Sequence, residues 1–225
     1  MKKGKIIVID GIDGSGKETQ TKLIVDKLSR DGVKNMLISF PRYDNPSSCL
    51  VKMYLNGEFG SNPKDVNAYA ASSFYALDRY AAYKQDYGEF YNNGGIIITD
   101  RYTTSNMVHQ AAKIKEIDEK NKYLEWLIQF EYEILGIPKP DKVFFLNMPY
   151  EFSIKLMKER KNKMTQDNKK DIQESSEEHL KDAYNNACNI AIKYGWNEIN
   201  CVEEDKLRSI ENINEELYQE IKKYI

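Results

Sequence analysis

Cysteine is scarce in this sequence of 225 residues, which contains only Cys49, Cys188 and Cys201. The number is odd, the three positions are widely spaced and no CxxC pair occurs, so the sequence indicates neither a disulfide framework nor a zinc site. Scattered cysteines of this kind fit a reducing compartment. We therefore expect a cytoplasmic protein.

Long apolar runs are missing as well. The first residues, Met1-Lys2-Lys3, followed by the apolar residues 6–9, are typical of the start of a signal peptide, but Asp10 ends that run after four residues. The apolar region of a signal peptide needs roughly 7–15 residues, and no stretch approaches the ~18 apolar residues of a membrane span. We expect neither a secretion signal nor a membrane partner.

The sequence also lacks an excess of positive charge, with 33 Lys and Arg against 35 Asp and Glu. A general nucleic-acid-binding protein normally shows a basic excess, so we do not expect a nucleic-acid partner. A small anionic ligand stays possible, because a pocket can be basic in an acidic protein. The composition, 41% hydrophobic and 30% charged, is that of a globular chain. Without a break in composition, we expect a single domain over residues 1–225.

Short apolar runs alternate with longer amphipathic stretches. Near-continuous hydrophobicity over five or six residues is typical of strands buried on both faces of a parallel sheet, and alternation with helices predicts a doubly wound α/β fold. The expected strands are residues 5–10, 34–40, 95–100, 142–147 and, more weakly, 197–202. The expected helices are residues 17–30, 47–56, 65–87, 105–112, 118–135, 150–160, 176–194 and 207–224.

A glycine-rich loop with the pattern GxxxxGK joins the first expected strand to the first expected helix. Glycines let the backbone wrap a phosphate with its N–H groups inward, and the helix N-terminus adds partial positive charge. The lysine supplies a charge for the β- and γ-phosphates. The order strand–loop–helix predicts a fold of the P-loop NTPase type, with about five parallel strands and helices on both faces. The loop consists of Gly11, Ile12, Asp13, Gly14, Ser15, Gly16 and Lys17.

The position after the loop lysine departs from this motif. A Ser or Thr there normally places its hydroxyl on Mg²⁺, whereas here Glu18 follows Lys17 and Thr19 comes one position later. Glu18 either points to solvent or brings its carboxylate to the metal. In both cases the metal needs other acids, and the candidates are Asp13, inside the loop, and Asp100, at the end of the third strand where a Walker-B carboxylate lies.

A phosphate loop alone is compatible with a kinase, an ATPase, a GTPase or a nucleotide-gated binding protein. The NKxD sequence of guanine readers is approached only by residues 162–165, NKMT, which lack the aspartate and do not end a strand. Residues 159–171 are almost entirely polar. This segment is either a solvated surface loop or a flap over an anionic ligand.

The arginines indicate a second anion site that faces the loop. Arg42 follows the second expected strand and Arg101 follows the third. In a parallel sheet both lie at the carboxyl edge, where α/β sheets bind ligands. Tyr75 and Arg79, four residues apart, share one helix face. This pair either belongs to an ordinary amphipathic helix or provides a ring and a guanidinium that hold a nucleobase. A kinase for a small phosphorylated acceptor needs this arrangement.

Taken in order along the chain, these motifs resemble the thymidylate kinase family, which phosphorylates dTMP to dTDP with ATP. The resemblance covers essentially the whole chain, and its most diagnostic part is the Asp-Arg-Tyr segment with the polar residues that follow it. The matching segments are residues 10–17 (DGIDGSGK), Phe40-Pro41-Arg42-Tyr43, residues 75–79 (YALDR), Asp100-Arg101-Tyr102, Ser105-Asn106 and His109-Gln110.

The resemblance implies a role for each matching residue. The dTMP phosphate is expected at Arg42 and Arg101, and the base between the ring of Tyr75 and the guanidinium of Arg79. Tyr75 stands where the family typically has Phe, and its hydroxyl needs a partner or water. The remaining residues expected around dTMP are Asp13 at the 3′-hydroxyl, Asn106 or Gln110 at the base edge, His109 on the 2′ side of the sugar, and Phe40, Pro41, Tyr43 and Ser105.

The resemblance also implies catalysis by Lys17, Arg101 and Asp13. Gly14 occupies a loop position where some members place a cation, so Arg160, in a lid over residues 159–172, is expected to supply the missing charge. ATP and Mg²⁺ are the implied cofactors, and a homodimer is the implied assembly. Two alternatives remain: a kinase for another nucleoside monophosphate, such as dUMP, and a non-catalytic nucleotide-gated P-loop protein.

Overall fold

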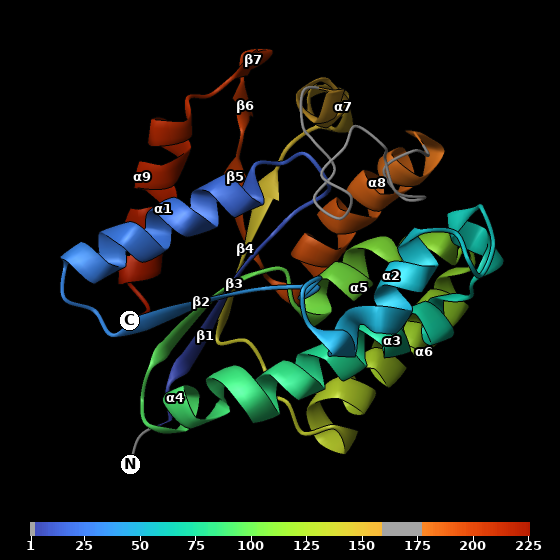
Figure 1. Ribbon diagram of the computed structural model, residues 1–225. Coiled ribbons are helices and arrows are strands. Elements are labelled where there is room, and N and C mark those ends of the chain that lie inside the picture. The colour runs from blue at the N-terminus through green and yellow to red at the C-terminus, as the bar shows by residue number, and fades with distance from the viewer. Residues whose placement is uncertain (1–2, 159–176) are drawn as a thin grey trace.

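The computed structural model describes residues 3–158 and 177–225 (Figure 1). Its centre is a five-stranded sheet in the order β2-β3-β1-β4-β5. Every neighbouring pair in this sheet is parallel, so the predicted parallel sheet is confirmed. The strands are β1 (Lys5–Asp10), β2 (Asn35–Ser39), β3 (Ile96–Asp100), β4 (Lys142–Asn147) and β5 (Asn197–Asn200).

The central strand β1 shows why the apolar runs are continuous. Ile6 and Val8 belong to a core cluster on one face of the sheet, and Ile7 and Ile9 belong to a cluster on the other. Successive side chains of a strand point to opposite faces, so a strand that is covered on both sides needs an apolar residue at every position. All four side chains are fully buried.

Helices cover both faces of the sheet (Figure 1). On one face lie α1 (Lys17–Arg30) and α9 (Ile210–Lys222), which contribute to the cluster that contains Ile7 and Ile9. The other described α-helices are α2 (Cys49–Leu55), α3 (Ala68–Ala82), α4 (Gly88–Asn92), α5 (Thr103–His109), α6 (Ile117–Ile128), α7 (Tyr150–Lys158) and α8 (Glu177–Tyr194). None of these helices is long and apolar enough to cross a bilayer.

Two of the predicted helices change their winding before they end. The segments predicted as helices at 65–87 and 118–135 both pass into a turn of π-helix, at Tyr83–Tyr87 and Gln129–Ile134. A π turn is not visible in a 3.6-residue apolar period, and such turns are frequent at functional sites. A short antiparallel hairpin of β6 (Val202–Glu203) and β7 (Lys206–Leu207) was also not predicted.

Single turns of 3₁₀-helix complete the described elements. They are Pro46–Ser48, Pro63–Asp65 and Ala111–Lys113. The predicted lid at 159–172, including Arg160, lies outside the described residues.

Candidate active site at the carboxyl edge of the sheet

The phosphate loop joins β1 to α1, and the local geometry explains why glycine occupies several of its positions. Gly14 and Gly16 adopt positive φ angles of 76° and 82°, a conformation that other residues rarely adopt. At Gly11, a Cβ would lie 3.0 Å from the carbonyl oxygen of Leu146. The loop can therefore pass close to β4 only without a side chain at this position.

Gly14 also has no room for a side chain. A Cβ at this position would come within 2.7 Å of the backbone oxygen of Ser153 and of Cγ of Met157, both on α7. The hydroxyl of Ser153 donates a hydrogen bond to the backbone oxygen of Asp13. Helix α7 therefore packs directly on the loop, and a cation carried by position 14 is sterically excluded in this arrangement.

Lys17 begins α1 and turns its amine back into the loop. Its Nζ donates to the backbone oxygen of Ile12 at 2.9 Å and lies 3.9 Å from Oδ1 of Asp13. Burial and, to a smaller extent, the nearby Arg101 charge lower the pKa of Lys17 to about 8, while Asp13 and Asp100 oppose the shift. The amine is still mostly protonated at pH 7.

Asp10, the last residue of β1, connects the loop to α5. It accepts hydrogen bonds from the backbone N–H of Gly11 at 2.8 Å and from Ser105 Oγ at 2.9 and 2.8 Å, and Thr104 also donates to it. Burial raises the pKa of Asp10, against the opposing charge of Arg101. The one hydroxyl proton of Ser105 is thus donated to Asp10, a contact that was not predicted from the sequence.

A pocket opens beside the loop, with a space of about 470 Å³ counted together with the solvent at its mouth. All lining residues except Leu55 belong to the set that the sequence predicted around dTMP. Of that set, Arg42 alone is not among the lining residues as described. The lining consists of Asp13, Phe40, Pro41, Tyr43, Leu55, Tyr75, Arg79, Arg101, Ser105, Asn106, His109 and Gln110.

Arg101 stands between the loop and the pocket. Its φ angle of 67° is unusual for a residue with a side chain, and strain of this kind clusters at functional sites. Nη2 pairs with Asp13, while Nη1 donates to Ser105 Oγ at 3.4 Å and to His109 Nε2 at 3.2 Å. Burial disfavours the charge of Arg101, but Asp13 and Asp10 outweigh burial and raise its pKa.

His109 is buried and neutral. Burial lowers the pKa of His109 well below its usual value, and the adjacent Arg101 charge acts in the same direction. Because Nε2 accepts from Arg101, the ring proton must sit on Nδ1. This Nδ1 is buried and has no hydrogen-bond partner in the described part of the chain.

Arg79, on α3, is held by a carboxylate that the sequence did not predict. Its Nε and Nη2 donate to Oε2 and Oε1 of Glu131, both at 2.6 Å, and both side chains are buried. Thr103 Oγ1 donates to Glu131 at 2.7 Å and Asn106 Nδ2 at 3.3 Å. Burial works to lower the pKa of Arg79, but the Glu131 charge outweighs burial and raises it. The π turn Gln129–Ile134 carries Glu131 into this position.

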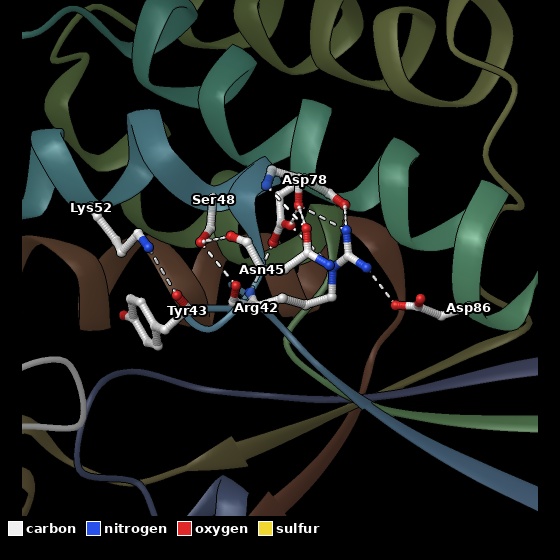
Figure 2. Close-up of polar contacts among 8 residues, drawn as sticks. Arg42, Tyr43, Asn45, Ser48, Lys52, Asp78 and Asp86 are labelled. Carbon is white, nitrogen blue, oxygen red and sulfur yellow. Dashed lines mark hydrogen bonds and ion pairs between the residues drawn. The ribbon is translucent and has the colours of Figure 1, made fainter.

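Arg42 is not among the residues that line the pocket, and its side chain is directed toward α3 and the π turn after it (Figure 2). Its backbone N–H donates to Asp78 Oδ2 at 2.9 Å and its Nε to Oδ1 at 3.1 Å. Nη2 donates to Ser47 Oγ at 2.8 Å, and Nη1 pairs with Asp86. The side chain expected at the acceptor phosphate is thus enclosed by two carboxylates of this chain.

Two buried side-chain oxygens near the loop are available to accept a further hydrogen bond or to bind a ligand. Ser15 Oγ and Asp100 Oδ1 make no hydrogen bond with any residue that the structure describes. Within residues 3–158 and 177–225, no three His, Cys, Asp or Glu residues form a metal-binding cluster. Mg²⁺ is commonly held by one or two carboxylates together with waters and substrate phosphates, which fits Asp100.

Glu18 pairs with Lys22 at 2.9 Å on the exposed side of α1, and Thr19 is exposed.

A family model for thymidylate kinase matches residues 9–205. The chain belongs to the thymidylate kinase family. Thymidylate kinase of Mycobacterium tuberculosis is 32% identical over 137 residues, which span 60% of this chain and 62% of that protein. Thymidylate kinase of Brachyspira hyodysenteriae is 30% identical over 159 residues, or 71% of this chain and 70% of that protein.

The fold is also similar to a solved structure of thymidylate kinase from Candida albicans, whose description refers to broad substrate specificity and a novel structural element. The TM-score is 0.70 at 23% identity, and the superposition covers 98% of this chain and 92% of the other. At this identity the likeness supports the fold, and it agrees with the predicted α/β architecture.

Proposed function

We propose that this chain transfers the γ-phosphoryl group of ATP to dTMP and releases dTDP and ADP. One observation carries the proposal beyond family membership. Asp13 belongs to the phosphate loop and also lines the pocket, where it pairs with Lys17 on the loop side and with Arg101 on the pocket side. A donor phosphate on the loop and an acceptor phosphate in the pocket would meet at this residue.

The chemistry then needs cations rather than a base. The second pKa of a phosphate monoester is near 6, so dTMP is mostly a dianion at pH 7 and its oxygen can attack without losing a proton. The loop N–H groups and Lys17 would hold the β- and γ-phosphates, and Arg101 would neutralise the acceptor phosphate and the transferred group. Catalysis then consists of alignment and charge stabilisation.

The base would be read by Arg79 and Gln110. Two guanidinium nitrogens of Arg79, Nε and Nη2, bind Glu131, so Nη1 is the one that the described residues leave for a base carbonyl. Gln110 Oε1 is buried without a hydrogen bond to a described residue, whereas the amide nitrogen of Asn106 already donates to Ser72 and Glu131. Gln110 is therefore the better candidate for the base edge, with the ring of Tyr75 stacked on the base.

The sugar and the metal would share the phosphate loop. Asp13 would face the 3′-hydroxyl, with His109 on the 2′ side. Mg²⁺, when bound, would neutralise phosphate charge, and Asp100 and Asp13 are the residues that would hold it. On the basis of the resemblance, we also propose that Arg160 is the lid cation. We propose on the same basis that all 225 residues form one kinase domain.

We also propose a homodimer and a cytoplasmic location. Support for the homodimer comes from the family resemblance and from the apolar side chains exposed on α3, where Leu77 is 46% and Tyr80 is 36% exposed. The free thiols of Cys49, Cys188 and Cys201 support a reducing compartment. Light scattering on the purified chain at several concentrations would test the dimer.

An acceptor panel tests the proposed reaction. Purified protein is incubated with ATP, Mg²⁺ and dTMP, dUMP, dCMP or AMP, and ADP formation is followed. We expect rapid ADP formation with dTMP and an inactive Lys17→Ala variant. Preference for another monophosphate would assign a different kinase activity, and ADP formation with none of them would support a nucleotide-gated binding protein.

A further inference from the structure

The contacts of Arg42 suggest how the acceptor phosphate is admitted. This inference rests on the proposed function, because it takes dTMP as the pocket's ligand. Pro41 and Tyr43, the chain neighbours of Arg42, both line the pocket, but Arg42 does not. Figure 2 shows its guanidinium directed toward Asp86, away from the ring of Tyr43. The guanidinium of Arg42 lies beside the proposed phosphate site, but it is bonded to acceptors of the protein itself.

Every guanidinium nitrogen of Arg42 already has an acceptor. Nε donates to Asp78 Oδ1 at 3.1 Å, and Nη2 donates to Ser47 Oγ at 2.8 Å and to the backbone oxygen of Asp78 at 3.3 Å. Nη1 pairs with Asp86. A phosphate is bound most strongly by two neighbouring N–H groups of one guanidinium. A guanidinium has five N–H groups, and these bonds leave only one of them, on Nη1, without an acceptor among the described residues. A phosphate that binds Arg42 through two N–H groups must therefore replace one of these acceptors.

The two carboxylates differ in how easily they can be replaced. Asp78 is buried, with a side chain 1% exposed, and it also accepts from the backbone N–H of Arg42. Removing a partner from a buried pair leaves an uncompensated charge, which is strongly unfavourable. Asp86 is 39% exposed and makes one contact to Arg42. An exposed carboxylate that leaves an ion pair is solvated by water, so its release costs little free energy.

We infer that Asp78 is a positioning residue for Arg42, and that Asp86 is the acceptor that the phosphate of dTMP replaces on Nη1. Asp78 holds Nε and the backbone N–H, so the base of the side chain stays fixed while Nη1 changes partner. Asp86, on the π turn Tyr83–Tyr87, competes with the phosphate and weakens its binding in proportion to the strength of its own pair. The two carboxylates therefore act on dTMP affinity in opposite directions.

Two asparagine variants test this difference. Asp86→Asn should lower the Kd and the KM for dTMP about two- to fivefold, which is the range of an exposed ion pair, and leave kcat unchanged. Asp78→Asn should raise both on the order of tenfold while the KM for ATP stays the same. Asp44→Asn is the matched control, because Asp44 is exposed, lies two positions from Arg42 and forms no ion pair with a described residue.

The double variant separates competition from a general charge effect. In an Arg42→Ala background, Asp86→Asn should change dTMP affinity by less than the error of the measurement. The inference is overturned if Asp86→Asn weakens dTMP binding, if it equals Asp44→Asn, or if its effect persists without Arg42. It is also overturned in its Asp78 part if Asp78→Asn raises the KM for ATP as much as the KM for dTMP. A wild-type chain that forms no dTDP would instead overturn the proposed function.

Discussion

Arg79 and Arg42 were both expected to bind the acceptor nucleotide, and the structure holds them in opposite ways. Arg79 is fully buried and paired through two nitrogens with one buried carboxylate, Glu131. Arg42 is partly exposed and shares its nitrogens among several acceptors, one of which, Asp86, is open to solvent. The first arrangement fixes a single guanidinium position, which suits the proposed role of Arg79 in reading the base. The second permits an exchange of partners, which suits the proposed role of Arg42 in binding the phosphate.

Removing the carboxylate partner of each arginine should have very different effects on stability. Glu131→Ala leaves the charge of Arg79 buried without a partner, and we expect a loss of about 3–5 kcal/mol in the free energy of unfolding. Asp86→Ala should lose no more than about 1 kcal/mol, because its pair is exposed. Equilibrium urea unfolding measures both.

Glu133→Ala is the control for the first of these variants. Glu133 lies in the same π turn as Glu131 but is exposed, so its removal should change stability by less than about 0.5 kcal/mol. A loss for Glu131→Ala no greater than for Glu133→Ala would show that Arg79 does not depend on its carboxylate.

The two arginines should also differ in what they recognise. Arg79→Ala should lower the ratio of kcat/KM for dTMP to that for dCMP by about ten- to one hundredfold, because a hydrogen bond from a charged donor to the base contributes about 1.5–3 kcal/mol. Arg42→Ala should raise KM for both nucleotides and leave their ratio unchanged. Steady-state kinetics with the two acceptors decides, and equal ratios in wild type and Arg79→Ala would remove Arg79 from the base site.

Lys17 extends the comparison to a buried cation that can lose its proton. Burial lowers the pKa of Lys17 to about 8. The amine is charged below this pH and neutral above it, so kcat/KM for ATP should be flat near pH 7 and fall up to tenfold per unit above about pH 8. The profile of kcat/KM reports the free enzyme. In Lys17→Arg, whose side chain keeps its proton, the remaining activity should show no such fall. A wild-type profile that stays flat to pH 9.5 would contradict this role.

Patterns local in the sequence predicted much of the fold. The bounds of β1, β4 and α1 are those expected, because an apolar run covered on both faces and a glycine loop before a helix are both local signals. Arg101 was predicted at the pocket because it follows a strand end, and parallel strands bring these ends to one edge. Most of the other lining residues were predicted from the family resemblance. These features follow from the local order of residues and depend little on which side chains pair across the fold.

The parts that were missed depend on which side chains meet across the fold. Arg42 and Asp78 are 36 residues apart in the chain, and Arg79 and Glu131 are 52 apart. A single sequence does not reveal such pairs. The π turns that place Asp86 and Glu131 do not interrupt the helical apolar pattern, so the carboxylates around both arginines became visible only in the folded chain.

A crystal structure of this chain with dTMP bound tests both arginines at once. We predict that the base contacts Arg79 while both of its bonds to Glu131 persist, and that the phosphate binds Arg101 and Nη1 of Arg42, with Asp86 released to solvent. A phosphate held by Arg101 alone while Arg42 remains on Asp86, or a base bound away from Arg79, would contradict this account.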